Sequence, residues 1–299
     1  MEGLNMKKFR NLVCVAAIAA TMCCMNGCTI SFGAKTNYSY KSADKYVAGD
    51  REISDKIETI EVDYLSGDVK IVQADTDSIS IKEKANKSIK DDLKVHTWVE
   101  GSTLHVRYCD SSRKINLTNL EKKLEITIPE DVQYEKLIVD MASGNVDAEC
   151  DAKDFDLSAA SGDIVLKQSG KSDEIKIDTA SGGIAVTMEE ADKVDVSAAS
   201  GDILVNADKV NDFKANTASG TNEYHFENVP EKSNISSASG DVKVFLPEDA
   251  DVAAFIDTAS GDISYDFAFE KKGDDYICGK GSNKMKVDTA SGDVKIKKN

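Results

Sequence analysis

The sequence has few basic residues and few of the side chains from which an active site is usually recognised. Its 299 residues contain 37 Lys and Arg against 53 Asp and Glu, for a net charge of −16, and only four of them are Arg. Residues 1–28 hold three basic residues and one acid, so the rest of the chain carries −18. Such a surface repels phosphate backbones and anionic lipids, so we expect neither nucleic acid nor an anionic membrane surface as a partner.

Cysteine and histidine are scarce and scattered. Four of the seven cysteines lie in the first 28 residues, and the other three, Cys109, Cys150 and Cys278, lack metal-site spacing. At most one disulfide could form among these three, and we interpret them as free thiols. No cluster of unusual acids or bases surrounds Trp98 or the three histidines, which are His96, His105 and His225.

This lack of a cluster predicts a protein that is not an enzyme. The alternative that stays open is a polysaccharide-cleaving β-helix enzyme, because some retaining glycosidases hold their two carboxyl groups ~5–5.5 Å apart. A simple ladder of acidic residues on stacked strands would meet that spacing by accident.

One tripeptide is abundant, because Ser-Gly-Asp or a near copy occurs nine times. Between residues 144 and 261 the motif recurs every 18 to 21 residues, a period typical of a solenoid. Glycine supplies the positive φ of a tight corner, and Ser and Asp can bond their own backbone there. We therefore expect structural corners at these glycines: Gly67, Gly144, Gly162, Gly182, Gly201, Gly220, Gly240, Gly261 and Gly292.

The residues around each glycine alternate between apolar and polar. Around Gly201, Val196 stands five residues before the glycine, and Ile203 and Val205 stand two and four after it. This period indicates strands with one buried face. A two-stranded unit buries that face only when it stacks on its neighbours. The sequence therefore predicts an all-β fold, a parallel β-helix or β-solenoid with about 19–20 residues per coil.

The first 28 residues read as a targeting segment. Basic residues precede an apolar run from Leu12 to Met25, which leads to Cys28, and this run is too short to span a bilayer comfortably. The segment resembles a bacterial lipoprotein signal, which implies lipidation of Cys28; ordinary secretion and an uncleaved anchor are the alternatives. Met1 and Met6 are both candidate starts. Residues 29–52 are polar and are predicted to be a tether.

The domain predicted from residue 53 to 299 is regular only in part. Residues 53–140 are expected to form irregular opening coils with antiparallel pieces, and residues 141–299 regular Ser-Gly-Asp coils. The step from Gly261 to Gly292 is 31 residues long, and a hairpin insertion at Lys272-Gly273-Asp274 fits the extra segment best. The aromatic residues near this end fill a wider core or, alternatively, form an exposed binding strip.

The repeat Ser-Gly-Asp-Ile/Val, together with the turns Ile128-Pro129-Glu130 and Leu246-Pro247-Glu248, resembles a widespread bacterial family of cell-envelope β-helical domains. Its members are usually called putative adhesins or domains of unknown function. The resemblance implies a right-handed β-helix and an extracytoplasmic location, and it supplies no catalytic residues.

Aspartates at the corners raise the question of a metal ion. Asp241, Asp262 and Asp293 form the longest uninterrupted series, and stacked coils would place such carboxylates ~4.8 Å apart. Repulsion at that spacing either restricts them to hydrated positions or favours a cation such as Ca²⁺. Gly183 and Thr221 interrupt the column, so solvated corner residues are the first interpretation and a Ca²⁺ ladder the second.

The sequence therefore predicts a lipid-anchored extracytoplasmic β-solenoid that acts as a non-catalytic binding or scaffold module, an adhesin by resemblance. Its ligand would be a protein or a glycan that the sequence does not identify. A second hypothesis is an envelope-stress or signalling accessory that binds a membrane partner of the same cell.

Overall fold

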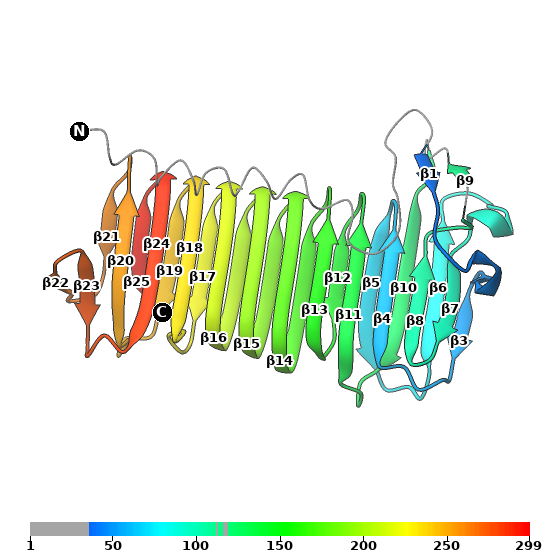
Figure 1. Cartoon of the computed structure of the whole chain (residues 1–299), viewed down its shortest axis with the longest axis horizontal. Coiled ribbons are helices and arrows are strands. Elements are labelled where there is room, and N and C mark those ends of the chain that lie inside the picture. The colour runs from blue at the N-terminus through cyan, green and yellow to red at the C-terminus, as the bar shows by residue number, and fades with distance from the viewer. Residues whose placement is uncertain (1–35, 112, 116–118) are drawn as a thin grey trace.

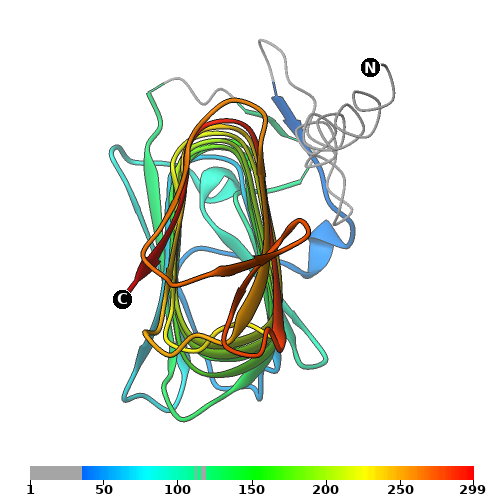
Figure 2. The same ribbon diagram turned by 90° about the vertical axis from the view of Figure 1, so that its left-hand side faces the viewer.

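The structure, a computed structural model, describes residues 36–111, 113–115 and 119–299. It is an elongated stack of strands, and the view along the stack shows a flattened ring with two long sides (Figures 1 and 2). The only helical segments in the described ranges are two 3-10 turns, η1 (Ala43–Lys45) and η2 (Asp91–Leu93). Neither is long and apolar enough to cross a membrane. The predicted all-β solenoid is confirmed.

One long side, which we call the A wall, contains the strands that lead into the glycine corners. From the N-terminal end of the stack it consists of β8 (Thr103–Arg107), β4 (Thr59–Tyr64), β11 (Tyr134–Met141), β13 (Ala152–Ala159), the second halves of β14 (Ile164–Ser181), β15 (Ile184–Ser200) and β16 (Ile203–Ser219), and then β18 (Lys232–Ser239), β24 (Asn283–Ser291) and β20 (Val252–Thr258). All of these neighbours pair in parallel.

The other long side, the B wall, contains the strands that leave the corners. In the same direction it consists of β6 (Ile79–Ala85), β10 (Lys122–Pro129), β5 (Asp68–Ala74), β12 (Val146–Glu149), the first halves of β14, β15 and β16, and then β17 (Asn222–Phe226), β19 (Val242–Leu246), β25 (Val294–Lys298) and β21 (Ile263–Tyr265). Here only β6 runs antiparallel to its neighbour.

The core lies between the walls because every second side chain points inward. Along β13 buried side chains alternate with partly exposed ones, and Phe155, Leu157 and Ala159 are buried. Toward the C-terminal half the rings of Phe213, Tyr224 and Phe226 pack edge to face with centroids 5.0–5.2 Å apart. These aromatic residues are buried in the core.

The N-terminal end is closed by antiparallel strands. β7 (His96–Glu100) forms a hairpin with β8 around Gly101 and Ser102, β2 (Val47–Ala48) pairs with β7, and β3 (Arg51–Ile53) pairs with β6. β1 (Thr36–Tyr38) pairs with β9 (Arg113–Ile115). The predicted tether of residues 29–52 is therefore too long, since residues 36–52 dock on the solenoid. Buried Tyr38 explains this, because its hydroxyl donates to the Asp63 carbonyl.

The C-terminal end has the predicted hairpin, formed by β22 (Glu270–Lys272) and β23 (Asp275–Cys278). β23 pairs antiparallel with β20 and covers its edge.

The coils do not follow one another in chain order, which corrects the simple stack that the sequence suggested. The final strands β24 and β25 insert between β18/β19 and β20/β21, and the opening strands β4 and β5 lie inside β8 and β10 (Figure 1). Long segments precede Lys122 and follow Tyr265. At each end they allow the chain to form the outermost coil before it continues with a coil that lies further inside the stack. Asp293 therefore lies between Asp241 and Asp262, so the three aspartates lie on consecutive coils but not in chain order.

Candidate binding surface

The nine motif glycines form one continuous column at the corner. Their φ angles lie between +108° and +152°. A Cβ atom on any of them would lie 1.9–2.2 Å from the carbonyl oxygen of the residue in the adjacent coil. For Gly201 that atom is the Gly182 oxygen, at 1.9 Å. Glycine is thus required twice, by the backbone conformation and by the close approach of the next coil. In the outermost coil Lys122 occupies the position of the corner glycine, and its backbone carbonyl lies next to Gly67.

Several of the aspartates that follow the motif glycines accept hydrogen bonds from the adjacent coil. One carboxylate oxygen of Asp241 accepts the Asp293 N–H at 2.9 Å, and one of Asp293 accepts the Asp262 N–H at 3.0 Å. The Asp262 N–H and Lys295 lower the pKa of Asp293. Asp163 and Asp202 accept the N–H groups of Gly183 and Thr221 in the same way, both at 2.7 Å. Among the described residues no group of three His, Cys, Asp or Glu side chains is arranged to hold a metal ion.

The small residue three positions before several of the glycines has a related role. Thr179 and Thr258 point inward, and their hydroxyls donate to the carbonyls of Gly162 and Gly292 at 3.4 and 3.2 Å. Such bonds satisfy corner carbonyls that would otherwise be buried without a partner.

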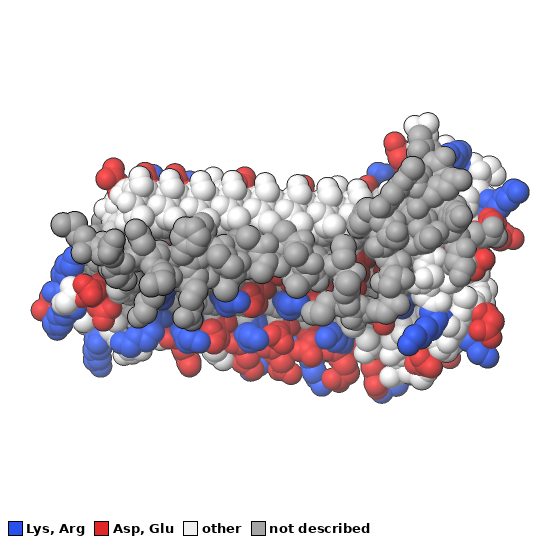
Figure 3. Space-filling model, turned by 45° about the horizontal axis from the view of Figure 1, so that its top comes forward, with Lys and Arg blue, Asp and Glu red and all other residues white. Residues whose placement is uncertain are grey.

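The outer face of the A wall is covered by paired charges. Lys214 lies 2.8 Å from the Asp195 carboxylate, Lys232 lies 3.0 Å from Asp212, and Lys193 pairs with Glu174. Each pair joins neighbouring coils. Figure 3 shows basic and acidic side chains side by side on this face, below an uncharged ridge. Exposed pairs of this kind contribute little stability, ~0–1 kcal/mol each.

The outer face of the B wall differs because three consecutive coils place apolar side chains on it. Val165, Ala185 and Leu204 lie side by side in register, and Leu204 is 39% exposed. We call these three residues the B-wall strip. It borders an open hollow of about 480 Å³ that is also lined by Gly182 and Gly183. The hollow opens there because Gly183 replaces the corner aspartate of its coil.

Polar and aromatic groups continue this face toward the C-terminal end. His225 and Phe245 stack with ring centroids 4.2 Å apart and planes 6° from parallel. Glu223 lies 2.8 Å from His225 and 3.4 Å from Lys243, and these two partners lower the pKa of its carboxyl group. Sequence reasoning missed this surface, although the apolar residues three positions after Gly162, Gly182 and Gly201 were a detectable signal.

The N-terminal coil contains a buried ion pair that the sequence did not reveal. The Lys122 ammonium lies 2.6 Å from Glu83 and donates to the carbonyls of Leu93 and Tyr108 at 2.7 and 2.6 Å. Glu83 also accepts the Tyr64 hydroxyl at 2.6 Å. Burial lowers the pKa of Lys122, although Glu83 opposes that shift. Because all of these groups are buried inside the coil, we interpret them as a structural ion pair that closes the N-terminal end of the solenoid.

Trp98 and His105 pack against each other in the N-terminal hairpin of β7 and β8. Trp98 stacks on His105 at 5.5 Å and contacts Tyr46 at the same distance. His105 lies 3.2 Å from Glu61, which also pairs with Arg107. His96 lies in β7, the strand that also holds Trp98, and is buried, whereas His225 lies in β17, on the B wall. The cysteines Cys109, Cys150 and Cys278 are free thiols.

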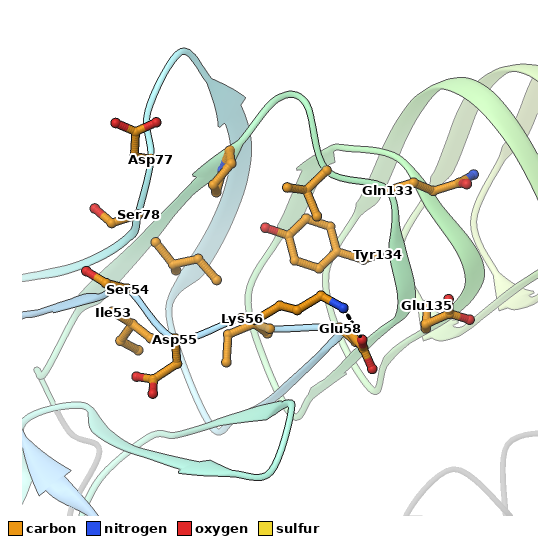
Figure 4. A pocket seen from close by; sticks show the side chains of 14 residues that line it. Ile53, Ser54, Asp55, Lys56, Glu58, Asp77, Ser78, Gln133, Tyr134 and Glu135 are labelled. Carbon is orange, nitrogen blue, oxygen red and sulfur yellow. Dashed lines mark hydrogen bonds and ion pairs between the residues drawn. The ribbon is translucent and has the colours of Figure 1, made fainter.

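A hollow of about 340 Å³ at the lower bend is the strongest alternative to the B wall (Figure 4). Its carboxylates do not converge, because Asp77 and Glu135 lie on opposite sides of it and Glu58 is paired with Lys56 at 2.7 Å. At the C-terminal tip, Tyr265, Phe269 and Tyr276 contact one another edge to face, with Tyr265 43% exposed. Because the rings pack against one another, little ring face is left on which a ligand could stack.

Comparison with known proteins relates the chain to one family. The model of a family described as Toastrack DUF4097 matches residues 57–297. The comparison with curated proteins gives no match.

Three solved structures are similar to the chain. A putative adhesin from Bacteroides fragilis is 14% identical, with 85% of this chain and 97% of that one covered and a TM-score of 0.45. A putative lipid binding protein from Parabacteroides distasonis is 16% identical, with 84% and 96% covered and a TM-score of 0.44. A putative cell adhesion protein from Clostridium sporogenes is 14% identical, with 84% and 100% covered and a TM-score of 0.26.

Proposed function

The chain belongs to the Toastrack DUF4097 family, and from that starting point we propose that it is a non-catalytic binding module anchored outside the cell membrane by lipid on Cys28. We propose further that it binds a glycan on the B-wall strip. The observation that carries this proposal is the difference between the walls, since one coil pairs its outer charges on the A wall and exposes apolar side chains on the B wall.

A glycan fits the chemistry of the B wall better than a folded protein does. The B-wall strip is one side chain wide on each coil, which suits the apolar C–H face of a sugar chain rather than a broad interface. Asp202 and Asn206, on either side of Leu204 along the strand, place polar groups beside it. Ligand sites typically combine an apolar floor with a few orienting polar groups in this way.

The absence of catalysis is proposed because many acidic side chains of the repeats have structural partners. Asp163, Asp202 and Asp241 accept backbone N–H groups at the corners, and Asp195 and Asp212 pair with lysines on the A wall. A glycosidase needs one carboxyl group that protonates the leaving group and a second that acts on the sugar.

The lipid anchor is proposed from the sequence, because Cys28 lies outside the described residues. If it is present, it restricts the position of the solenoid. Eight residue steps separate Cys28 from Thr36, where β1 begins, so the chain spans at most ~29 Å between them.

This short reach favours a second candidate function. A domain held near its own membrane is well placed to bind a partner of the same cell, as an envelope-signalling accessory would. A glycan of another cell could bind the B-wall strip only if it reached this position close to the membrane.

The proposal is tested by glycan binding of the full chain carrying Cys28→Ser, which removes the acyl group. The protein is applied to immobilised envelope and host glycans. Leu204→Lys should weaken the binding of the preferred glycan about tenfold or more, because it buries a charge under the sugar face. Asn216→Lys is the matched control, since it adds the same charge to the A wall within the same strand, β16.

Glycan binding lost with Leu204→Lys and kept with Asn216→Lys would support the proposal. Binding that survives Leu204→Lys, or that both variants abolish, would contradict it. The signalling accessory would be favoured instead if no glycan bound and a membrane protein of the same cell protected Leu204 from oxidation by hydroxyl radicals.

A further inference from the structure

A cluster of lysines occupies the N-terminal end of the B wall, apart from the B-wall strip. Lys70 of β5, Lys82 and Lys84 of β6 and Lys123 of β10 line a hollow of about 370 Å³. We call these four residues the lysine cluster. It contrasts with the net charge of −16 of the whole chain.

Two of the four lysines face each other across paired strands. In the antiparallel pairing of β10 with β6, Lys123 lies directly opposite Lys84. Like charges at directly opposed positions of a sheet repel and destabilise the pairing. On the A wall, lysines of neighbouring coils instead lie beside acids, as Lys214 does beside Asp195. The fold therefore does not itself require this arrangement.

The cluster is also poorly neutralised. Lys123 lies 3.4 Å from Asp68, but Lys70, Lys82 and Lys84 make no ion pair within 4 Å among the residues that the structure describes. In the register of the sheet Glu125 lies between Lys82 and Lys70, and Asp147 lies on the other side of Lys70, so the two acids balance the two lysines of that row. The excess positive charge is thus concentrated at Lys84 and Lys123.

We propose that the lysine cluster binds a phosphate ester, with Lys84 and Lys123 on either side of the phosphate oxygens. A shared anion would convert the repulsion between the two ammonium groups into attraction. Lysine binds phosphate as a point charge that adapts to the position of the oxygens, which suits a ligand held between two flexible side chains.

The phosphate ester could come from two sources, a lipid headgroup and a soluble phosphate ester of the cell envelope, which the experiment below distinguishes. The cluster lies in the end coils of the stack, where the described chain begins, so the lipid anchor in the proposed function would keep it near the bilayer. The binding chemistry itself does not depend on that anchor or on the B-wall strip.

The test uses the full chain with Cys28→Ser, so that an acyl group cannot insert into lipid. Binding is measured to glycerol 3-phosphate by NMR and to vesicles of phosphatidylcholine with one-fifth phosphatidylglycerol by co-sedimentation. Lys84→Gln with Lys123→Gln should weaken binding about thirtyfold, the effect of two lysines near an anionic surface. Glu125→Gln should strengthen it.

The matched control is Lys193→Gln with Lys214→Gln, which makes the same change in net charge on the A wall. Removing like charges from Lys84 and Lys123 should leave the melting temperature unchanged or slightly higher, so lost binding would not reflect unfolding.

Binding of vesicles alone would assign the phosphate to lipid, and binding of both probes would assign it to phosphate esters in general. Either result, with the control unaffected, supports the proposal. Equal losses in the two double variants would show non-specific charge attraction, and no binding of either probe would also overturn the proposal.

Discussion

The A wall and the B wall are built by the same coils, share one core and meet at one glycine column, yet their outer faces differ. On the A wall, Lys214 and Lys232 pair with acids of the preceding coil. On the B wall, Val165, Ala185 and Leu204 are apolar, and the lysine cluster near the N-terminal end is only partly neutralised. Because the inward positions and the corner glycines determine the fold, the outward positions were free to diverge. We expect ligands on the wall where several outer side chains are not paired with one another.

The largest expected effect comes from the corner that joins both walls. Gly201→Val should destabilise the protein by about 4 kcal/mol or more, because it combines backbone strain with a Cβ atom 1.9 Å from the Gly182 oxygen. Thermal and urea unfolding measure this. Gly101→Ala is the control, since its turn has φ +63° but open space, and should cost only about 1 kcal/mol. Equal effects would mean that the close stacking of coils is not what requires glycine.

A smaller loss of stability is expected when the buried ion pair of Lys122 and Glu83 in the N-terminal coil is broken. Lys122→Met should destabilise by about 3 kcal/mol, because it leaves Glu83 buried without its cation. Lys122→Met with Glu83→Gln should recover much of that loss. A double-mutant cycle on urea unfolding measures the coupling, and additive effects would argue against a coupled pair.

The charged A wall should make stability depend on pH. Burial raises the pKa of Glu61, but the hydrogen bond from His105 and the charge of Arg107 outweigh it, so the pKa is lowered. A carboxyl group with a lowered folded-state pKa stabilises the fold above its unfolded pKa, and that contribution is lost as the pH falls below about 4.3. Melting temperature should therefore fall more steeply from pH 5 to 3 in the natural protein than in Glu61→Gln. Parallel curves would contradict this role of Glu61.

The smallest effect is expected for a single exposed pair of the A wall. Lys214→Gln should change the free energy of unfolding by less than about 0.5 kcal/mol, because solvent screens its contact with Asp195. Leu204→Lys, in the same strand, should also leave stability nearly unchanged while weakening glycan binding. A loss above 1 kcal/mol for Lys214→Gln would show that the ladder of charges stabilises the stack.

The sequence predicted the regular part of the fold well because each coil repeats the same constraints. Val196, Ile203 and Val205 repeat their spacing around Gly201, and that spacing indicated both the strands and the buried face. Chain order at the ends was not predictable in this way. A local pattern shows that Gly261 and Gly292 each sit at a corner, but not that the coil of Gly292 lies inside that of Gly261.

The candidate sites were harder to predict than the fold because they depend on register between distant strands. Lys84 and Lys123 are 39 residues apart and face each other only through an antiparallel pairing that the repeat does not contain. The same holds for Lys122 and Glu83. Leu204 was visible in the sequence as an apolar outward position, but its significance appears only when Val165 and Ala185 align beside it.

The measurement that tests the central claim most directly is photo-cross-linking on intact cells, with a photoreactive amino acid placed at position 204 or 214 of the full chain. Both positions lie in β16, one on the B wall and one on the A wall. We expect a glycan adduct from position 204 and none from position 214. A glycan adduct of equal yield from position 214, or adducts from neither position, would contradict the claim that the B wall is the ligand-binding face.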